Sequence, residues 1–433
     1  MSTETKDFAL DHLLSMNTTE HALPFPCEAT GQEPETLGFI GSAGRLHPMD
    51  DATQPESAPL TWKDGLLEDF EIFWRDLQPW LQQSGYMLRP RFRPGWVPSW
   101  KTSGKPVLLS EDAWSPYVGP MQFVPESTSE ERFWFPHTTD HGCREHPFEE
   151  EISTFLTSPQ MSTDPKNHCL PMLEILEIPD NPDTQIFVMK FMCTYDEPRF
   201  DTFGEAVDFF DQIFEGLQFM HKHLVAHRDC GSNNIMMDGQ HLYPNGFHPM
   251  FPSQSMDLYY SSKHYTRTQC GPLKYYFIDF GISIKFEPWQ PRTAIPIRGG
   301  DKTVPEFENG GDLGPLDPFA TDIYYLGNLI RQEFLDGQTD VRYLPVDGRV
   351  GFEFMRPLVT DMVNADPTKR PTIDEVVVRF EEIKNGLSSW KLRSRVRGKH
   401  EQYIFHMYRI ARHWYRRIGY ILKRVPPIRT PTS

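Results

Sequence analysis

Hydrophobic residues recur at helical spacing in several segments of the chain. The longest such pattern covers Phe203–His223, where apolar side chains return every three or four positions. Thr202 and Glu205 precede and enter this pattern with the spacing of a helix capping box, and Thr372 and Glu375 repeat the signal further on. We therefore predict helices over residues 63–83, 147–156, 203–223, about 321–335 and 373–385.

Other apolar runs lack helical spacing and indicate strands. The segment Thr184–Met192 reads TQIFVMKFM, a run of β-branched and aromatic residues that is typical of a buried strand. A second apolar run, YYFI, begins at Tyr275. By contrast, Leu88–Trp100 holds three prolines at short intervals and predicts an extended connector. The predicted elements include both helices and strands, and the predicted fold class is α+β.

The chain has 433 residues, enough for one large two-lobed domain with extensions. Residues 1–60 are rich in Ser, Thr, Pro and acidic residues, and we expect them to be mostly disordered. Residues 61–100 follow as an amphipathic helix and a proline-rich connector. The predicted domain then divides into 101–192 and 193–385, and a basic, aromatic tail covers 386–433.

The net charge of −17 hides an asymmetry between the tail and the rest of the chain. Residues 391–433 contain twelve Lys or Arg against one acidic residue, Glu401, which makes this tail about +11. The remainder carries 31 basic against 59 acidic residues, so its charge is about −28. An acidic body argues against nucleic acid as a partner. The tail predicts either a helix docked on the acidic body or a peripheral contact with an anionic membrane.

Cysteine usage and the absence of long apolar runs predict where the protein resides. The six cysteines are widely spaced, with no pair at metal-ligand or redox-motif spacing, so we expect reduced thiols. Glu4 and Asp7 near the start argue against a signal peptide. Without a run of ~18 apolar residues, no transmembrane segment is predicted. These features favour a cytoplasmic or nuclear protein.

Polar residues of the types that take part in catalysis and metal binding lie before and after the second predicted strand. His227, Arg228 and Asp229 are followed by Asn234, and Asp279 begins an Asp-Phe-Gly sequence directly after the apolar run. Phosphoryl transfer needs a carboxylate near the attacking hydroxyl and oxygen ligands for Mg²⁺ beside the triphosphate. Each signal is weak alone, but their order after a long helix is specific.

Three later residues agree with this interpretation. Val304-Pro305-Glu306 stands where protein kinases carry Ala-Pro-Glu, and Arg370 is expected to pair with Glu306. Asp322 is expected to begin a buried helix and to hold the loop that contains Asp229. These matches cover residues 203–385 and resemble the protein kinases.

More specifically, the chain resembles a group of protein-kinase-domain proteins from mushroom-forming fungi. This resemblance spans most of residues 85–425 and rests on LRPRFRPGWVPSW, FDQIFEGLQFMHKHLVAHRDCGSNNIMMD, HYTRTQ, KYYFIDFGIS and GFEFMRPLVTDMVNADPTKRPT. It implies a bilobal protein-kinase-like fold, with a degenerate N-lobe at 101–192 and a mainly helical C-lobe at 193–385. It also implies ATP and Mg²⁺ as cofactors and a protein as substrate or partner.

The resemblance assigns roles to individual residues. It implies catalytic roles for Asp229, Arg228 and His227, and it implies Mg²⁺ ligation by Asn234 and Asp279. Nucleotide binding would involve those two ligands together with two further residues, Glu151 and Met192. Glu151 corresponds to the helix glutamate that holds the phosphate-anchoring lysine in kinases.

The chain departs from the kinase pattern where the phosphates should be anchored. The expected strand lysine is missing, because no lysine occurs between Lys105 and Lys166, and residues 106–130 contain a single glycine. Substitutes for the anchor would be Lys105, Lys190 or Arg132. Gly231 also stands where serine/threonine kinases usually carry a lysine.

About 30 residues more than usual separate Asp229 from Asp279, and we expect them to loop out beside the site.

Three functions remain open from the sequence. The first is a protein kinase of impaired activity, of serine/threonine rather than tyrosine type. The second is a pseudokinase that acts as an interaction or allosteric module. The third, a small-molecule kinase, fits Glu306 and Arg370 less well.

Overall fold

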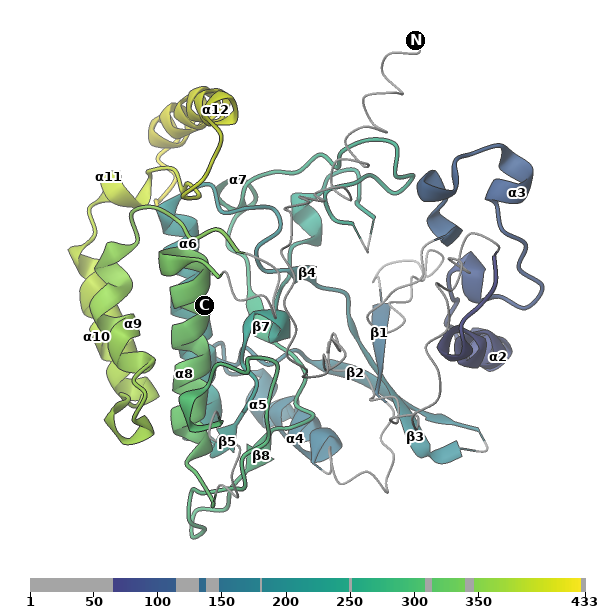
Figure 1. Ribbon diagram of the computed structural model, residues 1–433, viewed down its shortest axis with the longest axis horizontal. Coiled ribbons are helices and arrows are strands. Elements are labelled where there is room, and N and C mark those ends of the chain that lie inside the picture. The colour runs from purple at the N-terminus through teal and green to yellow at the C-terminus, as the bar shows by residue number, and fades with distance from the viewer. Residues whose placement is uncertain are drawn as a thin grey trace, which may run out of the picture.

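The computed structural model describes residues 65–113, 132–137, 148–179, 181–248, 251–307, 314–338 and 346–429. Within these ranges the chain is a mixture of helices and small sheets, as the α+β prediction requires (Figure 1). A three-stranded sheet with helix α2 lies on one side of the molecule. The long helices lie on the other side, and short strands connect the two parts. Residues 1–60, predicted to be disordered, lie outside the described residues.

The larger sheet is antiparallel and has the order β1-β3-β2. Its strands are β1 (Arg132–His137), β2 (Met172–Ile178) and β3 (Asn181–Lys190). The β-branched and aromatic run predicted as a strand therefore forms the central strand, β3. Phe187 pairs with Phe135 of β1 and with Ile175 of β2.

Helix α2 (Asp69–Gln83) covers this sheet and begins six residues later than predicted. Glu68 is the N-cap of α2 and forms a capping box with Glu71, which explains the later start. Trp74 and Leu81 of α2 are buried against the sheet and form a hydrophobic core with these residues: Tyr86, Leu88, Phe92, Leu176, Ile178, Ile186 and Val188.

The predicted extended connector, Leu88–Trp100, contains one short helical turn, and further turns follow it. These turns are η2 (Pro90–Phe92), α3 (Trp100–Ser103), η3 (Val107–Leu109) and η4 (Glu111–Ala113). Arg91 holds them against α2, because its Nε lies 2.5 Å from Glu71 Oε1 and both side chains are fully buried. A buried ion pair needs such hydrogen bonds to offset desolvation.

The short elements between the two parts carry the loops of the predicted site. Helices α4 (Glu149–Leu156) and α5 (Pro159–Ser162) precede β2, and α4 confirms the helix predicted over 147–156. A second sheet has the order β4-β6-β7, and β5 pairs with β8. These strands are β4 (Cys193–Thr194), β5 (Val225–Ala226), β6 (Ile235–Met237), β7 (Tyr275–Phe277) and β8 (Ile284–Lys285).

The helical part is built around α6 (Phe203–Lys222), whose predicted capping box between Thr202 and Glu205 is present. Phe210 of α6 contacts Phe334, Phe352 and Phe380, with ring centroids 4.7, 6.1 and 6.3 Å away. The helices around it are α8 (Pro318–Ile330), which continues as the π-helix Arg331–Asp336, α9 (Arg356–Met362) and α10 (Ile373–Gly386). The Thr372–Glu375 capping box of α10 is also confirmed.

The segment between β6 and β7 does not loop out as predicted. It contains η6 (Gln240–Leu242) and α7 (Arg267–Cys270), and its Leu242 and Phe247 belong to the main core. The buried guanidinium of Arg267 donates hydrogen bonds to the carbonyls of Tyr195 (2.6 Å) and Pro198 (2.5 Å). Because these bonds and apolar contacts hold the segment, it is part of the folded body.

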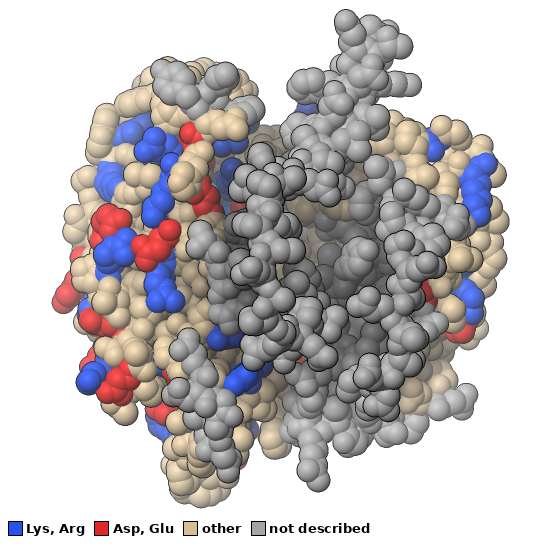
Figure 2. Space-filling model, in the orientation of Figure 1, with Lys and Arg blue, Asp and Glu red and all other residues tan. Residues whose placement is uncertain are grey.

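The C-terminal tail contains α11 (Ser389–Leu392) and α12 (Tyr403–Leu422), and α12 lies at the outer edge of the helical part (Figure 1). Among the helices that the structure describes, none has the length and apolar character to cross a membrane. Basic and acidic side chains are interspersed over the helical side of the molecule (Figure 2).

Candidate functional site

The loop after β5 is held by a buried carboxylate. Asp322 of α8 is fully buried and accepts hydrogen bonds from the backbone N–H groups of His227 (2.8 Å) and Arg228 (2.6 Å). Its Oδ2 also lies 2.9 Å from Nε2 of His221. These bonds hold Arg228 at a φ of 68°, a left-handed conformation that costs energy for a residue with a side chain. The predicted anchoring role of Asp322 is confirmed.

Asp229 and Asn234 contact each other directly. The Nδ2 of Asn234 lies 2.9 Å from both the backbone carbonyl and Oδ2 of Asp229, so it donates to two acceptors. The other carboxylate oxygen of Asp229 accepts the N–H of Gly300 at 2.7 Å. The backbone of Gly300 therefore lies directly against the Asp229 carboxylate.

Strand pairing brings Asp279 to the same place. β6 and β7 pair with Ile235 opposite Phe277, and the N–H of Ile278 donates to the carbonyl of Asn234 at 3.0 Å. Asp279 follows with a φ of 62°, and its Oδ1 accepts the N–H of Gly281 at 3.2 Å. The structure thus gathers Asp229, Asn234 and Asp279, which lie up to 50 positions apart in the sequence.

The pKa of Asp229 is raised to about 7, mainly by burial and also by the charge of Asp279, while the hydrogen bonds from Gly300 and Asn234 act in the opposite direction. A carboxylate with a pKa near neutrality can accept a proton from a hydroxyl and release it again at physiological pH. The electrostatic influence of Asp279 is a second sign that the two carboxylates are neighbours.

The donor set fits a hard divalent cation. Both hydrogen bonds of Asn234 Nδ2 go to acceptors, which leaves its amide oxygen as the atom able to ligate a metal, and Asp279 supplies a carboxylate. No cluster of three or more His, Cys, Asp or Glu that could hold a metal occurs among the described residues. Mg²⁺ needs none, since it is often bound by one or two protein oxygens together with phosphates and water.

His227 has a positioning role in this arrangement. Its Nε2 lies 3.1 Å from the carbonyl of Ile278 and its Nδ1 lies 3.3 Å from the N–H of Asp229. A neutral ring protonated on Nε2 satisfies both contacts, and burial lowers the pKa of His227, which favours the neutral form. The ring also packs 5.2 Å from that of Phe280. His227 therefore links the two loops of the site.

The Arg228 side chain turns away from Asp229 towards the segment after β8. Its Nη2 donates to the carbonyl of Ile295 at 2.6 Å, and the side chain lines a small pocket with Ala294, Ile297 and Leu316. Arg228 therefore holds the segment around Ile295, a positioning contact in place of the catalytic role that the resemblance implied.

Met192 and Glu151 have different surroundings. Met192 is buried beside Leu170 and Ile278, in a small apolar cluster separate from the two larger cores. Because Ile278 immediately precedes Asp279, this cluster adjoins the predicted metal ligands. Glu151 of α4 is mostly exposed, and its Oε1 lies 3.9 Å from Nζ of Lys285 in β8.

Lys285 is a residue that sequence reasoning missed. The candidates for the cation near Glu151 were Lys105, Lys190 and Arg132, yet Lys190 pairs with Asp238 at 2.8 Å and Lys105 lies over the ring of Tyr259. The Arg132 side chain lies outside the described residues. Lys285 follows the Asp-Phe-Gly sequence by four residues, and nothing in its local pattern distinguishes it from an ordinary surface lysine.

Sequence reasoning also missed Gly299 and Gly300, which lie against Asp229. A Cβ added to Gly299 would lie 2.4 Å from Asp229 Oδ1, so glycine is needed for the close approach that lets Gly300 donate its N–H. The consecutive glycines were visible in the sequence, and they could have signalled a close backbone contact.

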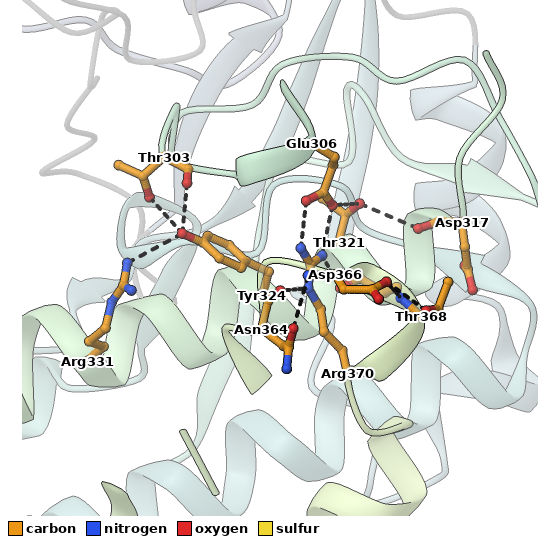
Figure 3. A network of polar contacts seen from close by, with 11 residues as sticks. Thr303, Glu306, Asp317, Thr321, Tyr324, Arg331, Asn364, Asp366, Thr368 and Arg370 are labelled. Atoms are coloured by element: carbon orange, nitrogen blue, oxygen red, sulfur yellow. Dashed lines mark hydrogen bonds and ion pairs between the residues drawn. The ribbon is translucent and has the colours of Figure 1, made fainter. Parts of the chain in front are cut away.

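Glu306 and Arg370 form the predicted ion pair. Arg370 Nη2 lies 2.6 Å from Glu306 Oε2 and Nη1 lies 2.8 Å from Oε1, in a two-pronged contact (Figure 3). The Arg370 side chain is fully buried and that of Glu306 is 8% exposed. The predicted pairing of Glu306 with Arg370 is confirmed, and it ties residues 305–307 to the start of α10.

Asp229 gives the site a testable pH dependence. Its pKa of about 7 in the folded protein exceeds the ordinary value of 3.8, so the carboxyl contributes stability below about pH 4 that is lost as the pH rises to 7. In Asp229→Asn this contribution is absent. The melting temperature of the variant minus that of the wild type should therefore rise from pH 4 to 7 and level off above. A difference independent of pH would contradict the shifted pKa.

Comparison with known proteins adds no relative: the chain matches no known protein-family description, and no curated protein matches it significantly.

Proposed function

We propose that the protein is a kinase-like phosphotransferase that binds Mg²⁺ and ATP between its sheet and its helical part, with a protein hydroxyl as acceptor. One observation carries the proposal. Asp229 and Asn234 come from one loop and Asp279 from a distant segment, and the β6–β7 pairing and the hydrogen bonds from Asn234 to Asp229 bring the three together. The hydrogen bonds that Asp322 accepts from the loop containing Asp229, and the Glu306–Arg370 ion pair, support the same two-lobed interpretation.

The residues divide the chemistry between them. Asp229 would accept the proton of the substrate hydroxyl as its oxygen attacks the γ-phosphorus of ATP. The bond from that phosphorus to the β–γ bridging oxygen then breaks, and ADP leaves. Asn234 and Asp279 would hold Mg²⁺, which neutralises phosphate charge when bound. Met192 and Ile278 offer an apolar surface for the base.

The phosphate anchor is the weak part of this site. Glu151 pairs with Lys285 of β8 at 3.9 Å, and the Glu151 side chain is 64% exposed, so this long pair contributes little energy. Losing a charged anchor costs roughly 10²–10³ in rate. We therefore expect phosphotransfer that is slow compared with that of ordinary protein kinases.

A second candidate is a pseudokinase that binds partners without catalysis. The observation that favours it is the hydrogen bond from Gly300 to Asp229 Oδ1, which occupies an oxygen that a substrate hydroxyl would need. In this alternative the same fold would present its surface to another protein, and Asp229 would serve to hold residues 299–300 in place.

Nucleotide binding separates the first candidate from a protein with no nucleotide site. We expect Mg²⁺–ATP to raise the melting temperature of the wild type, and expect Asp279→Asn to abolish that rise. Asparagine tolerates the left-handed φ of residue 279, so this variant removes charge with little backbone strain. The matched control is Asp238→Asn, which neutralises a carboxylate paired with Lys190 outside the proposed site. No thermal shift with any nucleotide in the wild type would rule the proposal out.

Catalysis requires a separate measurement. Incubation with γ-labelled ATP and Mg²⁺ should label the protein itself or a general protein substrate, and Asp229→Asn should remove the label while nucleotide binding persists. Binding without labelling would favour the pseudokinase. Labelling that survives in Asp229→Asn would mean that Asp229 is not the catalytic base.

A further inference from the structure

Helix α12 is docked on the body by its polar face, the reverse of an ordinary surface helix. Among the side chains of α12 that the structure describes, those of His413 and Arg417 are buried, each 4% exposed. Arg416 Nη2 lies 2.5 Å from Asp201 Oδ1, and the Tyr420 hydroxyl lies 2.9 Å from Thr266 Oγ1. Surface helices normally bury an apolar stripe and expose their charges.

The opposite face of α12 exposes a continuous apolar stripe. Its members recur every three, four or seven positions, so they project from one side of the helix. Their exposed fractions are large: Met407 50%, Tyr408 66%, Trp414 43%, Tyr415 83%, Ile418 53%, Ile421 48% and Leu422 78%. Trp390 of α11 is 64% exposed, and its ring lies 5.9 Å from that of Trp414, which extends the stripe beyond the helix.

The orientation of α12 is held at both ends. Before the helix, Glu401 accepts from Arg395, and Arg409 Nη1 lies 2.7 Å from its Oε1. After the helix, Arg393 donates to the carbonyl of Val425, and the carbonyl of Pro427 lies where a Cβ on Gly204 would be. The apolar stripe is therefore presented outward by a fixed framework.

We propose that this stripe is a docking surface for an anionic membrane, on which α12 lies parallel to the lipid surface. Exposed basic residues, Arg412, Lys423 and Arg424, accompany the apolar stripe, and residues 402–429 contain no acidic side chain. Acidic lipid headgroups complement this charge. Trp and Tyr, which contribute three of the seven members of the α12 stripe, favour the membrane interface.

Shape and charge favour a lipid surface over a second copy of the chain. Because α12 lies at the outer edge of the molecule, it can meet a flat surface without obstruction by the body (Figure 1). Two copies that paired through this stripe would bring like-charged Arg and Lys side chains together, which opposes association. This proposal is independent of nucleotide binding and of catalysis.

Flotation of the full chain with lipid vesicles tests the proposal. We expect the protein to float with vesicles of phosphatidylcholine and phosphatidylserine, to float much less with phosphatidylcholine alone, and to lose binding as salt rises. Ile418→Glu should lower the apparent affinity for these vesicles about tenfold or more, since it places a charge where the wild type would bury an apolar side chain in the lipid. The matched control is Val378→Glu, which changes an exposed valine of α10 (59%) in the same way and should bind as the wild type does.

Three results would overturn the membrane assignment. One is equal flotation of wild type and Ile418→Glu, provided that both melt at the same temperature. The second is flotation that is the same with and without phosphatidylserine. The third is a wild-type dimer in light scattering that becomes monomeric in Ile418→Glu and binds no vesicles, because the stripe would then be covered by a second copy.

Discussion

Arg370→Ala is expected to lower the free energy of unfolding by about 3–5 kcal/mol, because it leaves the Glu306 carboxylate buried without its partner. The loss extends beyond one ion pair. Arg370 Nε donates to the carbonyl of Asn364 at 2.8 Å, and Nη1 donates to that of Ala320 at 3.0 Å. Three segments therefore lose hydrogen bonds at once. The melting temperature should fall by roughly 6–20 °C.

Lys369→Ala serves as the matched control for this variant. Lys369 is the neighbouring residue, its side chain is 69% exposed, and its contact with Asp366 is a surface pair of about 0–1 kcal/mol. A double variant, Glu306→Leu with Arg370→Met, should recover part of the stability, since replacing both charges removes the desolvation cost. If Arg370→Ala melted like Lys369→Ala, the buried pair would have no structural importance.

Asp322→Ala is expected to have the second large effect, because its carboxylate accepts two backbone N–H groups that would then be buried without acceptors. An unsatisfied buried donor costs about 1–3 kcal/mol, so the two together cost roughly 2–6 kcal/mol. Released from these bonds, Arg228 should also leave its left-handed conformation. Asp229 and Asn234, which is hydrogen-bonded to it, would then lose their positions. Because Asn234 is a proposed Mg²⁺ ligand, Mg²⁺–nucleotide binding should weaken.

Hydrogen exchange at single residues can check this prediction directly. The amides of His227 and Arg228 should exchange faster in Asp322→Ala than in the wild type, and chemical denaturation should give the free-energy change. Asp361→Ala is the control, because it removes a half-exposed carboxylate of α9 that pairs with Arg379 at the surface. Unchanged exchange at both amides would mean that Asp322 does not hold the loop.

Sequence reasoning located the elements whose signals are local. Helices α6 and α10 were predictable because their capping boxes and apolar residues lie within a few residues of one another. Helix α4 was also predicted, although no side chain caps it. The strand β3 was predictable from a run of β-branched and aromatic residues. The Asp229–Asn234 contact was also foreseeable, since the two residues are separated by one tight turn.

Interactions between distant segments escaped the same reasoning. Lys285 lies 134 positions from Glu151 and Gly300 lies 71 positions from Asp229, and no local pattern links the members of either pair. The segment between β6 and β7 was expected to loop out, because about 30 residues more than usual separate Asp229 from Asp279. Instead Arg267, Leu242 and Phe247 anchor it, a result of contacts with residues before α6 and with the core.

The tail separates the two kinds of information most clearly. The structure shows helix α12 over Tyr403–Leu422. The sequence alone predicted a basic, aromatic tail that forms either a helix docked on the acidic body or a contact with an anionic membrane. It did not determine which face meets the body, since either face can be buried by a suitable neighbour. Asp201 and Thr266, brought together only by the folded chain, bind the basic and hydroxyl groups of α12 and turn its apolar face outward. That orientation depends on long-range electrostatic complementarity, which exists only once the acidic body has folded.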